Sequence, residues 1–299
     1  MTANIVHLFL NPTANRGRAN QCKNRIIRIL EESGISVITY VSQSKKDLET
    51  NIFNQVEKGA TRIIVAGGDG SIHEAVNGIL KSNNKVMLGI VPIGTGNDFA
   101  KSNNISLDWE HTTKSLSQRI VEKKMLRVID IGKCNDRFFI NSFGCGFDVK
   151  VALAANSIKL PIGKFIYLLA FIKALFKGTK GPDLEIQSNE FSWKGPVTFA
   201  SINNSSWVGG MFNIAPMADN TDGMLDVLIA KPMTRLEVVL MVPKFLNKTH
   251  DGSKQIIHKS ITYLSLNSKK NIYCQLDGEI QALQKRFEIQ TVKKILTLL

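Results

Sequence analysis

Two glycine-rich turns in the first hundred residues carry the residue types that bind phosphate and a divalent metal. The first reads Ala66-Gly67-Gly68-Asp69-Gly70-Ser71, after a strand-like run at residues 62–65 and before a helix-like run at residues 72–80. Glycines let the backbone approach phosphate oxygens, and the N–H groups at a helix start favour negative charge. An acidic residue in such a turn suggests a cation beside the phosphate, so Asp69 predicts a magnesium-nucleotide site. Taken by itself, this run is also compatible with an ordinary tight turn.

The second turn, Gly94-Thr95-Gly96-Asn97-Asp98-Phe99, follows another apolar run at residues 86–91. Thr95 offers a hydroxyl to a phosphate or to a metal-bound water, and Asp98 offers a second carboxylate. Ligands of open α/β sheets bind beyond the carboxyl ends of the strands. We therefore expect Asp69 and Asp98 at one sheet edge, where they would hold magnesium directly or through water.

A third polar turn follows the strand-like residues 5–10 and reads Asn11-Pro12-Thr13-Ala14-Asn15-Arg16-Gly17-Arg18. It is small, polar and basic, as the binding of a triphosphate requires. Asn-Pro pairs are common in turns, so this segment gains its meaning from the two glycine turns that follow it.

These turns and three later motifs resemble the diacylglycerol kinase catalytic family, which includes soluble bacterial lipid kinases and the sphingosine and ceramide kinases. The later motifs are Asn141-Ser142-Phe143-Gly144-Cys145-Gly146-Phe147-Asp148, Asp222-Gly223-Met224-Leu225-Asp226 and Leu276-Asp277-Gly278-Glu279. The Gly-Gly-Asp-Gly element is shared with NAD kinases and phosphofructokinases, whereas the Gly-Thr-Gly-Asn-Asp-Phe element favours the lipid-kinase branch. The resemblance covers nearly the whole chain.

The resemblance implies ATP as the phosphate donor, Mg²⁺ as the cofactor and a set of nucleotide contacts. Those contacts are expected at Asn11, Pro12, Thr13, Ala14, Asn15, Ser42, Gly67, Gly68, Gly70, Ser71, Ile72, His73, Glu74 and Thr95. Ser42 is equally compatible with an ordinary strand-end serine, and the His73 side chain is expected on a helix surface rather than in catalysis. Asn15 stands where many relatives have glycine and Ser71 where threonine is commoner, which can tune nucleotide preference.

In this family a glutamate accepts the proton of the lipid hydroxyl, and the resemblance assigns that role to Glu279. Glu279 follows Leu276-Asp277-Gly278, a strand end and turn that would point its carboxylate into a cleft. An exposed acid of a hairpin turn is the alternative. The predicted catalytic residues are thus Glu279, Asp69 and Asp98.

The family also holds a structural magnesium, which the resemblance assigns to the Asp222 carboxylate and the backbone carbonyls of Asp219 and Met224. Hard cations accept such mixed oxygen ligands. An ordinary Asp-Gly hairpin is the alternative. Asp130 occupies a position where the family tends to have an acid linked to the metal networks, and Asp148 is compatible with a strand-end or cap role.

The elements that must position these residues change character near residue 125. Before it, strand-like and helix-like runs alternate, as in a parallel sheet covered by helices. Strands are expected at residues 5–10, 36–41, 62–66 and 85–91, and helices at residues 22–32, 46–57, 71–80 and 112–121. Beyond it, short runs between turn residues predict an antiparallel β domain. Its strands are expected at residues 127–133, 137–143, 184–187, 191–201, 225–230, 261–266 and 272–276.

The resemblance implies an α/β N-terminal domain of Rossmann-like character, similar to NAD kinase and phosphofructokinase, plus a C-terminal antiparallel β-sandwich domain. We expect the nucleotide-binding domain at residues 1–128 and the lipid-substrate domain at residues 129–288. The tail at residues 289–299 is expected to return to the first domain.

Residues 149–180 interrupt the strands with helix-like sequence. One helical face would carry Phe165, Leu168, Leu169, Ile172, Leu175 and Phe176, with lysines nearby. Such a helix can lie in a membrane interface, or it can pack on the β domain with its lysines in water. Ile166, Tyr167 and Ala170 widen the apolar stripe beyond one face, which favours packing.

The chain of 299 residues carries a formal net charge of +13. A basic surface attracts anionic membranes, whereas no nucleic-acid motif with interleaved aromatic residues is present. No apolar run reaches the ~18 residues that span a bilayer. There is no signal-peptide pattern, and the four cysteines have neither metal nor disulfide spacing. We expect a cytoplasmic protein in reversible contact with the membrane, with a homodimer suggested by the family.

The leading hypothesis is an ATP- and magnesium-dependent kinase of a lipid hydroxyl, such as that of diacylglycerol. Phosphatidylglycerol, a sphingoid base and an undecaprenol-like alcohol are alternative lipids. A kinase of a soluble acceptor, such as NAD or a polyol, is disfavoured by the second glycine turn and by the apolar residues 165–176. A nucleotide-binding regulator without catalysis is disfavoured by the joint presence of Asp69, Asp98 and Glu279.

Overall fold

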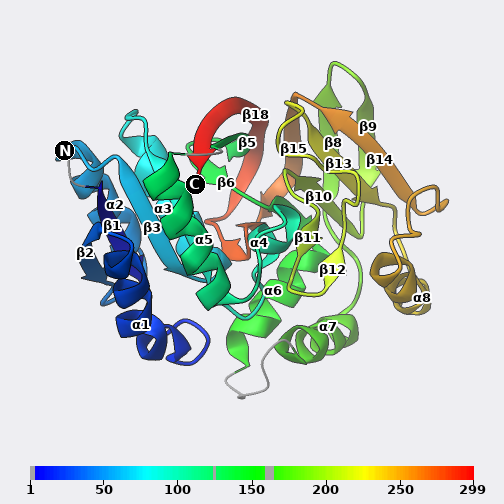
Figure 1. Cartoon of the computed structure of the whole chain (residues 1–299). Helices are drawn as coiled ribbons and strands as arrows, with labels where there is room; N and C mark the ends of the chain where they lie inside the picture. The colour runs from blue at the N-terminus through cyan, green and yellow to red at the C-terminus, as the bar shows by residue number, and fades with distance from the viewer. Residues whose placement is uncertain (1–3, 124–125, 159–164) are drawn as a thin grey trace. The chain divides into compact units, whose positions relative to one another are not determined.

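The chain divides into two compact units in a computed structural model that describes residues 4–123, 126–158 and 165–299 (Figure 1). The first unit comprises Met1–Ile129 and Lys294–Leu299. The second unit comprises Asp130–Lys293. None of the helices within the described ranges combines the length and the apolar character that crossing a bilayer requires.

The first unit is built on a parallel sheet in the order β2-β1-β3-β4. These strands are β1 (Asn4–Leu10), β2 (Ile35–Val41), β3 (Arg62–Gly67) and β4 (Met87–Pro92). The helices are α1 (Arg18–Glu32), α2 (Asp47–Glu57), α3 (Asp69–Lys81), α4 (Asp98–Ser102) and α5 (Trp109–Glu122). Strands β3 and β4 are buried over nearly their whole length, as expected for a parallel sheet with helices on both faces.

The helices of the first unit show why the sequence folds in this way. The buried positions of α1 recur every three or four residues, which gives the helix one apolar stripe against the sheet. Helix α5 begins where the Asp108 carboxylate accepts hydrogen bonds from the backbone N–H groups of Glu110 and His111. Helices α1 and α5 pack together, as do α2 and α3.

The long strand β18 (Gln284–Leu298) belongs to both units. Its final segment pairs in parallel with β4, with Thr297 opposite Met87. The backbone N–H of Leu299 donates to the carbonyl oxygen of Leu88 at 3.0 Å. The C-terminal end of the described chain therefore extends the first unit's sheet beyond β4.

The second unit is a sandwich of two antiparallel sheets. One sheet has the order β14-β13-β10-β7-β16-β17. The other contains β18-β15-β8-β9, with β5 paired to β18 and β6 paired to β5. The strand bounds are β5 (Arg127–Cys134), β6 (Arg137–Phe139), β7 (Ser142–Gly146), β8 (Asp183–Ser188), β9 (Ser192–Pro196), β10 (Phe199–Asn203), β13 (Leu225–Ala230), β14 (Ile256–Ile261), β15 (Tyr263–Ile272), β16 (Cys274–Leu276) and β17 (Glu279–Ile280). A short hairpin adds β11 (Trp207–Val208) and β12 (Phe212–Asn213).

The sandwich core lies between the two sheets. Phe143 of β7 and Phe287 of β18 meet edge to face, with their ring centroids 5.4 Å apart. Both rings are fully buried. Such aromatic contacts between layers bury a large apolar area and hold the two sheets together.

Three helices complete the second unit: α6 (Phe147–Ser157), α7 (Phe165–Lys177) and α8 (Arg235–Leu246). Helix α8 begins with a capping box in which the Thr234 hydroxyl accepts from the Glu237 N–H and the Glu237 carboxylate accepts from the Thr234 N–H. The sequence predicts no element at residues 235–246, and Pro243 lies inside this helix.

The α/β unit and the antiparallel sandwich confirm the predicted fold class. The single strand predicted at residues 191–201 is wrong, since β9 pairs with β8 in one sheet and β10 pairs with β7 in the other. The chain crosses between sheets at residues 197–198. The strand predicted at residues 137–143 is likewise divided, into β6 and β7.

Candidate active site

The polar turns of the first unit converge at the carboxyl ends of its strands. In the sheet register, Leu10 lies opposite Ala66, and Gly67 lies opposite Pro92. The backbone N–H of Asn11 donates to the Ala66 carbonyl at 3.3 Å, and the N–H of Ser42 donates to the Leu10 carbonyl at 2.9 Å. The turns after all four strands therefore share the edge at which α/β proteins bind ligands.

The two glycine turns touch each other through their backbones. A Cβ atom added to Gly94 would lie 2.4 Å from the Cα atom of Gly68 and 2.6 Å from Asn97 Oδ1. A Cβ atom added to Gly67 would lie 2.4 Å from Ser71 Oγ. Gly68 and Gly94 are thus required by contact between the turns, and Gly67 by contact within its own turn; the sequence pattern alone does not reveal these reasons.

Replacing Gly94 by alanine is expected to lower the free energy of unfolding by about 1–3 kcal/mol, because the added methyl group forces the two turns apart. Chemical denaturation measures this change. The matched control is Thr95→Ala in the same turn, whose exposed side chain leaves no cavity when it is shortened. Equal unfolding midpoints for Gly94→Ala and the wild type would contradict the contact.

Asp69 and the turn that carries Asp98 lie together, as predicted. Asp69 Oδ1 accepts a hydrogen bond from the backbone N–H of Phe99 at 2.9 Å, so Asp69 holds the start of α4. Asp98 is 6% exposed, and its Oδ1 lies 3.2 Å from Lys101 Nζ. Both carboxylates therefore occupy one edge of the sheet, at the starts of α3 and α4.

Asn97 adds an acceptor that sequence reasoning did not assign. Its backbone is left-handed at φ 52°, and its Nδ2 donates to the Gly94 carbonyl at 3.1 Å. Its Oδ1 is buried and has no hydrogen-bond partner within the described part of the chain. A buried polar atom of this kind calls for a partner from outside the protein chain.

The first polar turn is held by its own side chains. Asn11 Oδ1 accepts from the backbone N–H of Thr13 at 3.1 Å and from its hydroxyl at 2.8 Å. Asn11 Nδ2 reaches the buried hydroxyl of Ser71 at 3.4 Å. Asn15 is left-handed at φ 46°, a conformation that asparagine tolerates.

Three residues after the first glycine turn were predicted as nucleotide contacts. The expected surface position of His73 is wrong: its side chain is 3% exposed and lies beside Asn77 on the next turn of α3. Ile72 is 1% exposed, so its side chain belongs to the core. Glu74 Oε1 accepts from the backbone N–H of Lys46 and so holds the start of α2.

The residues at this edge fit a nucleotide with its metal ion. In the described chain, no side chain caps the start of α3, and the buried Asn97 oxygen has no partner. Among the described residues no group of three or more His, Cys, Asp or Glu side chains forms a metal site. Magnesium commonly uses one or two carboxylates together with substrate phosphates and water, and Asp69 and Asp98 supply that number.

In the second unit, Asp277 fixes the turn that carries Glu279. The Asp277 carboxylate accepts three backbone N–H groups, from Ile140 at 2.9 Å, Asn141 at 2.7 Å and Ser142 at 3.0 Å. Asp277 itself is left-handed at φ 52°. Glu279 is half-buried and opens β17 directly after this turn. Asp277 thus fixes the turn that precedes Glu279, and the Asp-Gly pair is its sequence signal.

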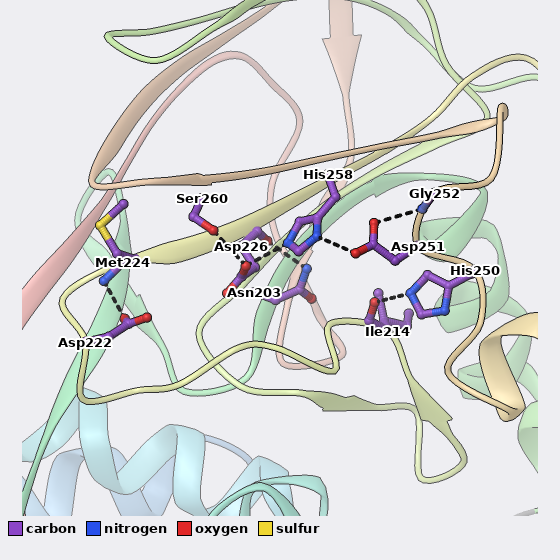
Figure 2. Close-up of polar contacts among 10 residues, drawn as sticks. All are labelled: Asn203, Ile214, Asp222, Met224, Asp226, His250, Asp251, Gly252, His258 and Ser260. Atoms are coloured by element: carbon purple, nitrogen blue, oxygen red, sulfur yellow. Dashed lines mark hydrogen bonds and ion pairs between the residues drawn. The ribbon is translucent and has the colours of Figure 1, made fainter.

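The predicted second metal site lies in the turn at residues 219–224, of which Figure 2 draws Asp222 and Met224. Asp222 Oδ1 accepts from the backbone N–H of Met224 at 2.8 Å, and Asp130 Oδ2 accepts from the N–H of Gly223 at 2.7 Å. Asp219 Oδ1 accepts from the N–H of Thr221 at 2.9 Å. Burial, followed by the nearby carboxylates, raises the pKa of Asp222. A nearby cation would favour the charged form of this carboxyl group.

Figure 2 also shows a polar network that the sequence did not predict. Asp226 Oδ1 lies 2.7 Å from His258 Nε2 and accepts from the Ser260 hydroxyl at 3.1 Å. His258 Nδ1 lies 3.5 Å from Asp251. The hydrogen bond to Asp226 raises the pKa of His258. This network ties β13 to β14 through side chains far apart in sequence.

Asp148 lies in the first turn of α6 and is half-buried. Burial raises its pKa to about 7. Gln275 Nε2 lies 3.4 Å from Asp148 Oδ2, whereas the buried Oδ1 has no hydrogen-bond partner in the described chain. A Cβ atom at Gly144 would lie 1.7 Å from Oδ2, so glycine is required beside this carboxyl group.

The fold and the turns define a two-domain kinase that joins an α/β unit to a β-sandwich. Residues 5–134 match the diacylglycerol kinase catalytic domain, and residues 141–298 match the YegS C-terminal NAD kinase beta sandwich-like domain. The chain belongs to the diacylglycerol kinase catalytic-domain family of ATP-dependent lipid kinases.

Known relatives are similar over most of their length. A diacylglycerol kinase of Bacillus subtilis is 27% identical over 273 residues, which cover 91% of this chain and 88% of the relative. A Yersinia enterocolitica protein named "Probable lipid kinase YegS-like" is 28% identical over 283 residues, covering 91% and 90%. A crystal structure of a diacylglycerol kinase from Bacillus anthracis shares the fold, with a TM-score of 0.75 at 18% identity and coverage of 100% and 97%.

Proposed function

We propose that this lipid kinase transfers the γ-phosphate of ATP to the free hydroxyl of diacylglycerol, giving phosphatidic acid. The observation that most strongly supports this proposal is that the polar turns converge at one sheet edge. Asp69 and Asp98 lie there, beside the backbone contact between Gly68 and Gly94. The names of the relatives support diacylglycerol as the acceptor. In the reaction, the hydroxyl oxygen bonds to the γ-phosphorus, and the bond from that phosphorus to the β–γ bridging oxygen breaks.

The first unit is proposed to hold the ATP phosphates. The N–H groups at the start of α3 face the edge formed by the strand ends, and the helix dipole favours an anion there. The Thr95 hydroxyl is exposed at the same edge. Arg16 and Arg18 carry positive charge in the first turn, so they would offset the charge of the triphosphate. Asn11, Thr13, Asn15 and Ser42 are the proposed further nucleotide contacts.

Asp69 and Asp98 are the proposed magnesium ligands, directly or through water. Bound magnesium would offset the charge that develops on the transferring phosphoryl group. The hydrogen bond from Phe99 to Asp69 fixes one of these carboxylates in place, which lowers the cost of orienting it for a metal. Asp222, with the carbonyls of Asp219 and Met224, is the proposed structural metal site.

Glu279 is the proposed general base. A carboxylate accepts the proton as the lipid hydroxyl attacks, and it must lie at hydrogen-bond distance from that hydroxyl. The three N–H groups that bind Asp277 hold the preceding turn, so they limit the positions that the Glu279 side chain can take. We further propose that the protein acts in the cytoplasm and contacts the membrane reversibly.

The test is transfer of labelled γ-phosphate from ATP to lipids presented in detergent mixed micelles, with and without magnesium. The panel contains diacylglycerol, phosphatidylglycerol, a sphingoid base and an undecaprenol-like alcohol, and NAD and a polyol are tested as soluble acceptors. Label in phosphatidic acid that disappears with EDTA is the expected result. Transfer to another lipid alone would replace the proposed acceptor, and transfer only to NAD or a polyol would overturn it.

A further inference from the structure

Helix α7 exposes large apolar side chains on the side that faces away from the sandwich. Its inner positions, Ala170 and Ala174, are fully buried. Its outer positions share one helical stripe with exposures of 40% or more: Phe165, Leu168, Leu169, Ile172 and Phe176. The helix therefore packs on the sandwich, which is the alternative that the sequence favours. Most residues of the predicted apolar face, however, lie on the exposed side of the helix.

Helix α8 repeats this arrangement. Val238, Met241 and Phe245 point into the core of the unit. The outer stripe consists of Leu236, Val239, Leu240 and Leu246, with exposures from 44% to 69%. A helix on a protein that meets only water places polar residues at such positions, so two apolar outer stripes in one unit call for an explanation.

The two helices are joined where α7 ends and α8 begins. Arg235 Nη2 donates to the Phe176 carbonyl at 3.0 Å, and the Thr179 hydroxyl donates to the Met233 carbonyl at 2.6 Å. Both helices contribute side chains to one apolar cluster, which includes Ala174 and Val238. The end of α7 thus lies next to the start of α8 in the second unit (Figure 1), and the outer stripes of the two helices are together called the α7–α8 surface.

The charged residues of the segments that carry these helices are basic with one exception. Residues 165–180 contain no acid, and residues 231–248 contain one, Glu237, whose carboxylate is used by the capping box. The basic residues of the two segments are Lys173, Lys177, Lys180, Lys231, Arg235, Lys244 and Lys248. Apolar side chains flanked by lysines fit the interface of an anionic bilayer, where the chains enter the acyl boundary and the lysines meet lipid phosphates.

We infer that the α7–α8 surface docks this kinase on anionic lipid bilayers. The inference rests on the proposed function, since an enzyme with a membrane lipid as its substrate must meet that lipid in the bilayer. Phe176, which is 77% exposed, and Leu240, which is 62% exposed, are the side chains expected to enter the lipid.

Binding to vesicles tests the surface without any kinase reaction. Sedimentation with phosphatidylglycerol–phosphatidylcholine vesicles, without ATP, compares the wild type with the double variant Phe176→Ser and Leu240→Ser. We expect the double variant to bind at least about tenfold more weakly, because two large apolar side chains are removed. The matched control is Leu107→Ser in the first unit, where an apolar side chain of 49% exposure is lost.

Three results would overturn the inference. The double variant could bind like the wild type, or the wild type could bind pure phosphatidylcholine vesicles as tightly as anionic ones. The double variant could also turn a dimeric wild type into a monomer with unchanged vesicle binding, which would assign the surface to contact between two copies. Size-exclusion chromatography with light scattering detects this last case.

A tryptophan at the surface gives a direct readout of insertion. In Phe176→Trp, added anionic vesicles should shift the emission to shorter wavelength, and brominated lipids should quench it. Unchanged emission in a variant that still sediments with vesicles would contradict the predicted contact.

Kinase assays then separate docking from chemistry. The double variant should lose activity on long-chain diacylglycerol in vesicles and keep wild-type activity on dioctanoylglycerol in detergent micelles. Loss of both activities in a folded variant would contradict a pure docking role. A wild type that binds vesicles but transfers phosphate to no lipid would refute the proposed function and leave the docking surface intact.

Discussion

Replacing Asp69 with alanine is expected to lower kcat for phosphate transfer by about 10²–10³-fold, the loss typical of removing one group that stabilises transition-state charge. The same change removes the acceptor of the Phe99 N–H, so the start of α4 loses its anchor. A fall in activity alone would therefore not separate the electrostatic role from the structural one.

Asp69→Asn separates the two roles. The amide oxygen can still accept from the Phe99 N–H, so the free energy of unfolding should stay close to the wild-type value, whereas the negative charge is lost. We expect kcat in the asparagine variant to be as low as in the alanine variant. Wild-type kcat in Asp69→Asn would exclude a charge-dependent role for this residue.

Replacing Glu279 with glutamine is expected to lower kcat by about 10²–10⁴-fold, the usual contribution of a general base. Glutamine keeps the size of the side chain but cannot accept the proton. The KM for ATP should be unchanged, because the proposed nucleotide contacts lie in the other unit. Steady-state kinetics with both substrates varied measures kcat and the KM for ATP separately.

The matched control is Glu190→Gln, an exposed turn acid of the same unit. It should leave kcat and KM at their wild-type values. If Glu279→Gln instead raised the KM for the lipid and left kcat unchanged, Glu279 would bind the acceptor without taking its proton.

The alternating elements of the first unit followed from the sequence because parallel strands are buried on both faces. Runs such as residues 63–66 and 86–91 lack polar side chains and lead into glycine turns, which is the pattern of buried parallel strands. Asp69 and Asp98 could be placed at one edge for the same reason. The hydrogen-bond partners of these two residues could not be predicted, because the bond from the Phe99 N–H to Asp69 depends on how the two turns meet.

The second unit was less predictable because its contacts join distant residues. Asp226 and His258 are 32 positions apart, and Asp277 binds N–H groups more than 130 positions away. Antiparallel pairing brings such side chains together, and no local pattern reports that pairing. Helix α8 is difficult to predict because its outer face is apolar, so its sequence lacks the alternation of polar and apolar residues that marks an amphipathic helix.

The shared strand β18 has a consequence for synthesis on the ribosome. Strand β4 receives a parallel neighbour from residues that are translated only after the entire second unit. Until then part of the β4 edge has no neighbouring strand. Leu88, Ile90 and Val91 make β4 apolar, so this open edge is prone to pair with other chains. The nascent α/β unit is thus exposed to wrong strand pairing for the whole time that the ribosome needs to make the sandwich. Slow translation or a shortage of chaperones would therefore lower the yield of folded protein more for this chain than for one with separate domains.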